Sequence, residues 1–252
     1  MTDISGVRPN TRLPMPHTAV SLVVPVYNEA ENLVPLYEEV AAVFAAPDAS
    51  GWELVFVDDG SVDSTPRVLA ELKARDPRVR VLRLGQNCGQ SAAFAAGFRL
   101  VRGDVVVTLD GDLQNDPRDI PRMLAALADH DIVCGIRAKR RDDLIRRISS
   151  QIGNRCRRLF TGDAIVDTGC SLKAFRREVL PRLPMFNGMH RFLATLGGYA
   201  GARVNQIPVN HRERTRGVSK YGVWNRLWVT IGDLLAVTWM RRRWLTFQVE
   251  EV

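Results

Sequence analysis

The sequence predicts an α/β protein with a mostly parallel, Rossmann-like sheet that carries helices on both faces. Two observations predict this fold class. Apolar, β-branched runs alternate strictly with helical patterns between residues 20 and 135, and such alternation builds parallel sheets covered by helices. The chain has 252 residues, of which 46% are hydrophobic, so it can bury one sizeable core.

The predicted strands are five short runs bounded by turn residues, at 20–25, 53–58, 79–84, 105–109 and 132–135. Helical patterns connect them, at about 30–45, 63–75, 90–101 and 117–129. Asp63 or Ser64 can cap the second helix, and Pro117 suits the first turn of the fourth. Beyond these elements we expect a helix at about 144–160, an extended segment at 167–172 that re-enters the core, and a short helix at 177–183.

Polar clusters follow four of the predicted strands, at 25–29, 58–60, 110–112 and 135–137. The carboxyl ends of parallel strands lie along one edge of a sheet, which is where open α/β sheets bind ligands. We therefore expect all four clusters on a single rim that forms a binding site. The chain has no G-x-G-x-x-G after its first strand and no G-x-x-x-x-G-K-[ST], which argues against a dinucleotide oxidoreductase and a P-loop enzyme.

The most informative of these clusters is Asp110-Gly111-Asp112, directly after the fourth strand. Residues i and i+2 of an extended backbone point the same way, so both carboxylates can face one Mg²⁺ or Mn²⁺. Gly111 lets the backbone approach a ligand closely. An ordinary strand-end turn is the alternative interpretation, since Asp-Gly is a turn dipeptide.

The net charge of +7 is unevenly distributed along the chain. Residues 1–131 hold 12 Lys and Arg against 19 Asp and Glu, a balance of −7, whereas residues 132–252 hold 23 against 9, a balance of +14. Most of the basic residues are arginines, which suit bidentate binding of phosphate. Nucleic acid, anionic lipid and a phosphorylated substrate are all partners that composition alone allows.

Three motifs together resemble a GT-A glycosyltransferase of family 2: Pro-Val-Tyr-Asn-Glu at 25–29, Val-Asp-Asp-Gly-Ser at 57–61 with Asp63 and Thr65, and Asp-Gly-Asp-Leu-Gln at 110–114. A fourth, His-x-x-Arg-x-x-Gly-x-Ser-Lys-Tyr at 211–221, is similar to the dolichyl-phosphate mannosyltransferase type. That type moves a sugar from a nucleotide donor to a polyprenyl phosphate. The resemblance covers nearly the whole chain from about Ser21 and implies a GT-A domain at 19–220.

The resemblance implies roles for individual residues. Donor binding falls on Pro25, Tyr27, Glu29, Phe56, Asp58, Asp110, Gly111, Asp112, Gln114, Arg137, Arg214 and Lys220. Among these, the metal ligands would be Asp110, Asp112 and Gln114, and the catalytic residues Asp110, Asp112, Arg214 and Lys220. The acceptor phosphate would contact Arg146 and Ser150, which are one helical turn apart. The same helix carries Arg157 and Arg158, which we expect at the surface or facing lipid.

Many family members carry a Glu-Asp pair that supplies the catalytic base, where this chain has Met189-His190-Arg191-Phe192. A sugar hydroxyl must lose its proton before it attacks, whereas a phosphate acceptor is already an anion at neutral pH. The departure therefore fits a polyprenyl-phosphate acceptor, with His190 as a base being the alternative. The Q-x-x-R-W motif of processive polysaccharide synthases is also absent.

Residues 221–252 predict an amphipathic, basic helix and tail. A stripe at three- and four-residue spacing holds Trp224, Leu227, Trp228, Ile231, Leu234, Leu235 and Trp239. Charged residues at 226 and 233 make it a poor transmembrane span, and three arginines follow at 241–243. Such a helix lies in a membrane interface or packs on its own domain, a membrane-anchor protein or a second copy of the chain.

The remaining features concern the cell compartment. Residues 1–18 lack an apolar signal-peptide core and predict a flexible leader. Four cysteines without C-x-x-C spacing predict reduced thiols and a cytoplasmic location. The amphipathic, basic C-terminal helix adds the expectation of a peripheral position on the inner face of the membrane.

The predicted activity is metal-dependent, inverting transfer of a hexose from UDP-glucose or GDP-mannose to a polyprenyl phosphate. A saccharide acceptor and a sugar nucleotidyltransferase are the alternatives. We expect no nucleic acid as partner, since the arginine-rich segment at 146–158 has no interleaved aromatic residue.

Overall fold

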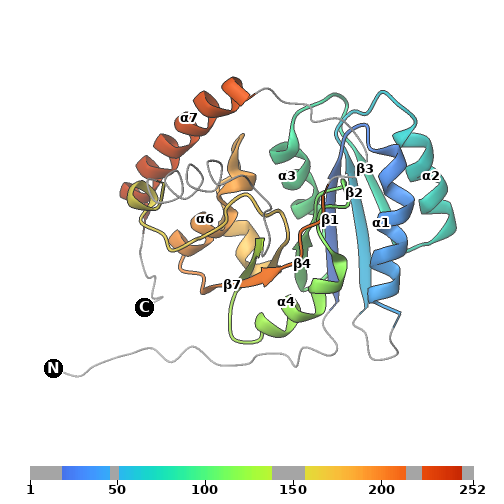
Figure 1. The fold of residues 1–252 in the computed structure, drawn as a ribbon, viewed down its shortest axis with the longest axis horizontal. Helices are drawn as coiled ribbons and strands as arrows, with labels where there is room; N and C mark the ends of the chain where they lie inside the picture. Colours follow the sequence, from blue (N-terminus) through green and yellow to red (C-terminus); the bar gives the residue numbers. More distant parts are fainter. Residues whose placement is uncertain (1–18, 46–50, 138–156, 214–222, 246–252) are drawn as a thin grey trace, which may run out of the picture.

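The computed structural model describes residues 19–45, 51–137, 157–213 and 223–245, and it confirms the α/β class (Figure 1). Within this part of the chain, one sheet has the strand order β3-β2-β1-β4-β6-β5-β7. Its strands are β1 (Val20–Val26), β2 (Trp52–Asp58), β3 (Val79–Arg83), β4 (Val105–Thr108), β5 (Ile132–Arg137), β6 (Lys173–Arg176) and β7 (Val204–Val209). Every pairing is parallel except those of β6, which is antiparallel to both β4 and β5.

The helices follow the strands as the alternating pattern predicts. They are α1 (Ala30–Val43), α2 (Thr65–Arg75), α3 (Gln90–Leu100), α4 (Ile120–Ala126), α6 (Leu193–Tyr199) and α7 (Val223–Arg242), with 3₁₀ turns η2 (Pro117–Asp119), η3 (Arg177–Arg182) and η4 (Met189–Arg191). The fourth predicted helix therefore begins as a 3₁₀ turn, where Asp116 accepts a hydrogen bond from the Arg118 amide. The segment 167–172 does return to the core, with Leu172 fully buried, but the strand itself begins one residue later.

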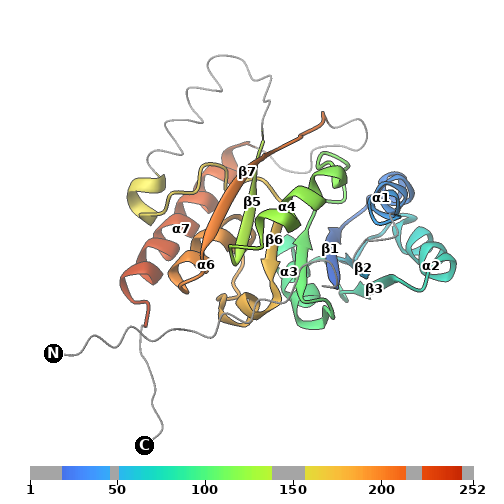
Figure 2. The ribbon, with the colours of Figure 1, turned by 90° about the horizontal axis from the view of Figure 1, so that it is seen from below.

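Two hydrophobic layers enclose the sheet. One face packs against α1, α2 and α4 around Leu22, Phe56 and Val107. The other packs against α3, η3, η4, α6 and α7 around Val106 and Phe175. Figure 2 shows α6 and α7 beside β5 and β7, away from α1 and α2. In the central strands β1, β2 and β4, residues of both layers are buried, so these strands are apolar on both sides, as buried parallel strands require.

The topology brings the predicted polar clusters to one rim. Strands β1, β2 and β4 are mutually parallel, and β5 has the same direction as β4 because β6 is antiparallel to both. Their carboxyl ends therefore share one edge of the sheet, and the carboxyl end of β7 joins them. Strand β6 begins at this edge, where Lys173 pairs with Thr108 of β4.

Helix α7 packs on the domain and also exposes apolar side chains. Val237 is fully buried, and Met240 and Trp244 pack against the same core layer. On the opposite side Leu235 is 60% exposed and Trp239 is 63% exposed. None of the helices in the described ranges is long and apolar enough to cross a membrane. The helix therefore has one face that packs on its own domain and an exposed apolar face that is available to a membrane or to another protein chain.

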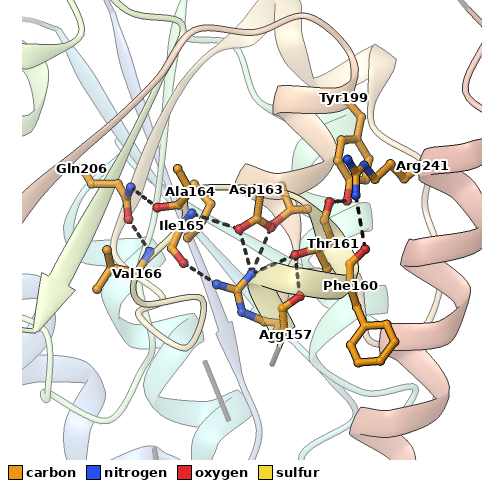
Figure 3. A network of polar contacts seen from close by, with 11 residues as sticks. Arg157, Phe160, Thr161, Asp163, Ala164, Ile165, Val166, Tyr199, Gln206 and Arg241 are labelled. Atoms are coloured by element: carbon orange, nitrogen blue, oxygen red, sulfur yellow. Dashed lines mark hydrogen bonds and ion pairs between the residues drawn. The ribbon is translucent and has the colours of Figure 1, made fainter. Parts of the chain in front are cut away.

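Arg157 corrects a prediction. We expected it at the surface, but its guanidinium is buried and forms an ion pair with Asp163, with Nη1 2.9 Å from Oδ1. It also donates to the carbonyl of Ile165 (Figure 3). Asp163 accepts a hydrogen bond from the hydroxyl of Thr195 on α6. Asp163 lies six residues further along the chain, outside the basic run that contains Arg157, so the run by itself did not indicate this buried pair.

Several predictions fall outside the described residues. These are the flexible leader at 1–18, most of the predicted helix at 144–160 with Arg146 and Ser150, and the loop with Arg214 and Lys220.

Candidate active site

The loops after β1 and β2 are joined by hydrogen bonds between them. The Asn28 amide donates to Ser61 Oγ at 3.0 Å, and Asn28 Oδ1 accepts from the Val62 amide at 2.9 Å. The Glu29 amide donates to Thr65 Oγ1 at 2.9 Å. Asn28 takes a left-handed backbone conformation, with φ 53°, which asparagine tolerates better than most residues. The two predicted donor-binding motifs therefore form one rigid wall of the rim.

Asp58 lies beneath this wall and is 1% exposed. Its Oδ1 accepts from the Ser61 amide at 2.9 Å, while Oδ2 is 3.4 Å from Arg83 Nε and, within the described residues, has no hydrogen bond. A buried acceptor of this kind is available to a ligand that donates a hydrogen bond. Phe56 is fully buried in the core below, so it supports the strand end, and a direct contact with a donor stays a prediction.

Asp59, unlike Asp58, uses both carboxylate oxygens to hold a neighbouring loop. Its two carboxylate oxygens accept hydrogen bonds from the Cys88 amide at 2.7 Å and the Gly89 amide at 2.8 Å. These contacts hold the loop that leads from β3 into α3. They place Gln90, the first residue of that helix, at the rim.

Asp110 and Asp112 occupy the centre of the rim, after β4. Gln90 Nε2 donates to Asp110 Oδ1 at 2.7 Å, and the Asp110 amide donates to Asn115 Oδ1 at 3.2 Å. Burial raises the pKa of Asp110, and the neighbouring charge of Asp112 raises it further. Asp112 is 8% exposed and accepts from the Gln114 amide at 3.2 Å. Two carboxylates are thus crowded in a place with little water.

Gly111 has a packing reason that the sequence did not indicate. A Cβ atom at this position would lie 2.9 Å from Val26 Cγ1. Glycine therefore lets the acidic loop fit against the end of β1. From the sequence we expected glycine here to let a ligand approach the backbone, whereas the structure shows that it lets the side chain of Val26 approach.

The donor set fits a divalent cation. No cluster of three or more His, Cys, Asp or Glu in the described ranges is arranged to hold a metal, so Asp110 and Asp112 would act as a pair. Magnesium is commonly held by one or two carboxylates together with water and substrate phosphates. A cation between these two acids would also offset the repulsion that raises the pKa of Asp110.

The start of the long C-terminal motif is fastened to the acidic loop. The Arg212 amide donates to the Gln114 carbonyl at 2.8 Å, Gln114 Nε2 is 3.4 Å from the Arg212 carbonyl, and Asn115 pairs with His211. The Arg212 side chain forms ion pairs with Glu39 at 2.7 Å and Asp116 at 2.8 Å. The first residues of this motif, His211 and Arg212, therefore lie beside the acidic loop.

Arg137 reaches the rim at the end of β5, but its guanidinium already forms an ion pair with Asp167. Its Nε and Nη2 each donate to Asp167 at 2.7 Å, and both side chains are largely buried. The hydrogen bond and charge of Asp167 raise the pKa of the guanidinium despite the opposing effect of burial. Its predicted contact with a donor phosphate would have to be made beside this carboxylate.

The structure adds two polar residues that sequence reasoning did not place at the acids, Gln90 and Lys173. Lys173 is 2% exposed, and its ammonium donates to the carbonyl of Cys170. Its charge acts on Asp110, lowering the pKa of that carboxyl against the effect of burial. A lysine between Leu172 and Ala174 in an otherwise apolar run was the available signal. Ser91 Oγ lies 2.8 Å from His190 Nδ1.

Comparison with known proteins identifies the family. The family model described as glycosyl transferase family 2 matches residues 21–183, which include the carboxyl ends of β1, β2, β4 and β5. The chain belongs to glycosyl transferase family 2. The match spans more than half of the chain, and the fold described above is the GT-A fold.

Two named relatives of this glycosyltransferase act on lipid phosphates. It is 38% identical over 96% of its length to the dodecaprenyl-phosphate galacturonate synthase of Rhizobium johnstonii, and covers 72% of that protein. It is 40% identical over 80% of its length to the undecaprenyl-phosphate 4-deoxy-4-formamido-L-arabinose transferase of Pectobacterium carotovorum, and covers 62% of that protein. The glycosyltransferase thus matches only part of the length of these relatives.

Solved structures show the same fold at low identity. The mannosyltransferase of Pyrobaculum calidifontis, solved with GDP-mannose and Mn²⁺, has a TM-score of 0.65 and 21% identity, over 96% of this glycosyltransferase and 69% of that chain. Glucosyl-3-phosphoglycerate synthase of Mycobacterium tuberculosis, solved with Mn²⁺, UDP and phosphoglyceric acid, has a TM-score of 0.66 and 18% identity, over 92% and 80%. These likenesses concern the fold.

Proposed function

We propose that this glycosyltransferase moves a hexose from a UDP- or GDP-sugar to a polyprenyl phosphate, with inversion at the anomeric carbon and with bound Mg²⁺ or Mn²⁺. The observation that carries the proposal is the pair Asp110 and Asp112 at the carboxyl end of β4. Strand β4 is the parallel neighbour of β1, so the pair lies beside the loops that follow β1 and β2. The named relatives act on dodecaprenyl and undecaprenyl phosphates, which supports this acceptor class.

The environment of His190 supports an acceptor that needs no base. Burial, with the charges of Arg191 and Lys173, lowers the pKa of His190 to about 3. Its Nδ1 is also engaged with Ser91 Oγ at 2.8 Å. A neutral imidazole with so low a pKa is a poor proton acceptor at neutral pH. A sugar hydroxyl would lack a base here, whereas a phosphate oxygen already carries the charge it needs.

The roles of the residues follow from their chemistry. Asp110 and Asp112, with the side-chain oxygen of Gln114, would hold the divalent cation, which when bound supplies a Lewis acid for the departing diphosphate. Tyr27, Glu29 and Asp58 would position the nucleoside. Arg137, Arg214 and Lys220 would bind phosphate oxygens, and Arg146 with Ser150 would bind the acceptor phosphate. The acceptor oxygen attacks the anomeric carbon from the side opposite the leaving group.

We place the reaction at the cytoplasmic face of the membrane. Apolar side chains of two segments are exposed, Leu159 and Phe160 on one and Leu235, Trp239 and Leu245 on the other. The segments are neighbours, because Arg241 Nη1 lies 3.5 Å from the Phe160 carbonyl. Exposed tryptophan and leucine beside the arginines at 241–243 suit the interface of an anionic bilayer, where the acceptor lipid is found.

The test is transfer of radiolabelled sugar into solvent-extractable lipid. The donors are UDP- and GDP-linked glucose, mannose, galacturonate and 4-deoxy-4-formamido-arabinose, and the acceptor is polyprenyl phosphate. We expect label in the lipid fraction with Mn²⁺ or Mg²⁺, loss of label with EDTA, and loss in Asp112→Asn. Asp104→Asn, which removes the exposed partner of Arg177 at the end of β4 opposite the acids, controls for nonspecific effects.

The outcomes separate the candidate reactions. Lipid label from one donor would confirm the acceptor class and name the sugar. Donor hydrolysis without lipid product would contradict the acceptor assignment and point to a saccharide acceptor. Release of pyrophosphate from a nucleoside triphosphate would identify a nucleotidyltransferase.

A further inference from the structure

Helix α7 makes an ion pair with the turn that carries His190. Arg191 Nη2 lies 3.1 Å from Asp233 Oδ2, and the two side chains are 28% and 14% exposed. Asp233 also fills the space next to Gly188, where a Cβ atom would lie 2.6 Å from its Cγ. Gly188 has φ 96°, a conformation that glycine adopts without strain. The charge that interrupts the apolar stripe of this helix is therefore held against η4.

The same turn is joined on its other side to α3. The Gly188 amide donates to Ser91 Oγ at 3.0 Å, and Ser91 Oγ lies 2.8 Å from His190 Nδ1. In the neutral tautomer with its proton on Nε2, His190 Nδ1 accepts the proton of the Ser91 hydroxyl, which accepts from the Gly188 amide at the same time. Ser91 is 4% exposed, so these contacts are protected from water.

The start of α3 in turn holds the acid pair. Gln90, next to Ser91, donates from Nε2 to Asp110 Oδ1 at 2.7 Å. A continuous series of contacts thus leads from Asp233 on α7 through the η4 turn to the first turn of α3 and to Asp110. Hydrogen-bond partners of metal-binding carboxylates orient those carboxylates, and their loss commonly weakens metal binding.

We propose that Arg191 and Asp233 are positioning residues of the active site. By their ion pair, α7 holds the η4 turn on α3, and α3 holds the Gln90 amide on Asp110. The C-terminal helix is then a part of the catalytic unit as well as a surface for the membrane. This inference rests on the proposed metal-dependent transfer, because the group that is positioned is the carboxylate proposed to bind the metal.

The experiment measures Mn²⁺ affinity by electron paramagnetic resonance, in the presence of UDP or GDP, whichever the wild type binds, together with kcat and KM for transfer. Asp233→Asn and Arg191→Gln break the ion pair from opposite sides. Each should weaken Mn²⁺ binding and lower kcat by about 10- to 100-fold, with little change in KM for the acceptor lipid. Asp233→Glu, which keeps the charge, should retain most of the wild-type Mn²⁺ affinity and kcat.

A double variant tests the route. If Asp233 acts through Gln90, then Asp233→Asn combined with Gln90→Ala should be no worse than Gln90→Ala alone, whereas independent effects would multiply. The matched control is Asp131→Asn, which removes the partner of Arg203 at 2.9 Å from the opposite edge of the sheet. This control should leave Mn²⁺ affinity and kcat as in the wild type.

The results separate this inference from the proposed function. An active wild type with unchanged Mn²⁺ affinity and kcat in Asp233→Asn and Arg191→Gln would overturn the inference alone. So would multiplying effects with Gln90→Ala, or loss of the folded state in both single variants, since the pair would then be only structural. A wild type that neither transfers sugar nor binds Mn²⁺ would contradict the proposed function and this inference with it.

Discussion

The buried pair of Arg157 and Asp163 yields a quantitative prediction. Its side chains are 10% and 8% exposed, and the guanidinium also donates to the Ile165 carbonyl. Asp163→Asn leaves that guanidinium buried without a counter-charge, which in comparable cases costs about 3–5 kcal/mol. Because asparagine keeps an oxygen that can accept from the Ile165 amide, we expect about 3 kcal/mol, the lower end of that range.

The assay is thermal and urea unfolding followed by circular dichroism. A loss of about 3 kcal/mol corresponds to a fall in Tm of about 6–12 °C for a domain of this size. The control is Asp104→Asn, which breaks an ion pair with Arg177 whose side chains are 50% and 49% exposed. Exposed pairs contribute about 0–1 kcal/mol, so its Tm should hardly change.

A double variant decides whether burial of charge is the cause. Arg157→Met with Asp163→Leu removes both charges, so it should lose less stability than the two single variants added together. The reasoning would be refuted if Asp163→Asn lost no more stability than Asp104→Asn, or if the two single effects simply added.

Three further predictions concern other parts of the molecule. Gly60 has φ 73°, and a Cβ there would lie 2.6 Å from loop backbone, so Gly60→Ala should lower the free energy of unfolding by about 1–3 kcal/mol, measured in urea; an unchanged midpoint would contradict this. Arg78 lowers the pKa of Asp76 from 3.8 to about 2, so the stability from this group is present above pH 3.8 and is lost as the pH falls towards 2. Asp76→Asn should therefore flatten the fall of Tm in that range, and an identical acid profile would count against the pair. Exposed Leu235 and Trp239 should insert into bilayers, so replacing both by alanine should reduce sedimentation with phosphatidylserine vesicles and leave Tm unchanged; equal sedimentation would exclude this surface.

The sequence predicted the elements from residue 20 to residue 137 well, because their signals are local. Strand and helix periodicities and the turn residues between them depend only on neighbouring positions. The shared rim also followed, since parallel strands must align their carboxyl ends. The strand β7 and helix α6 were not predicted. The strand-like residues of β7 are Val204, Ile207 and Val209, which do not alternate regularly with polar neighbours and so give no clear strand signal.

The surroundings of the acid pair illustrate what the sequence could not predict. Gln90 of α3 and Lys173 of β6 act on Asp110, and His190 of η4 contacts Ser91, the neighbour of Gln90. The antiparallel β6, which follows a long excursion, places Lys173 opposite Thr108. No local pattern specifies which distant residues a strand order will bring together.

The sequence by itself determined the family of this protein, the succession of strands and helices up to residue 137, and the acids at the strand ends, because these depend on short motifs and on local periodicity. Tertiary structure alone decided which charges are buried and paired. Arg137 and Asp233 are each held by a partner far along the chain, and Arg157 is held by Asp163 six residues on, outside the charged stretch to which it belongs. The cost of burying a charge depends on the distance to its counter-charge, and that distance exists only once the chain has folded.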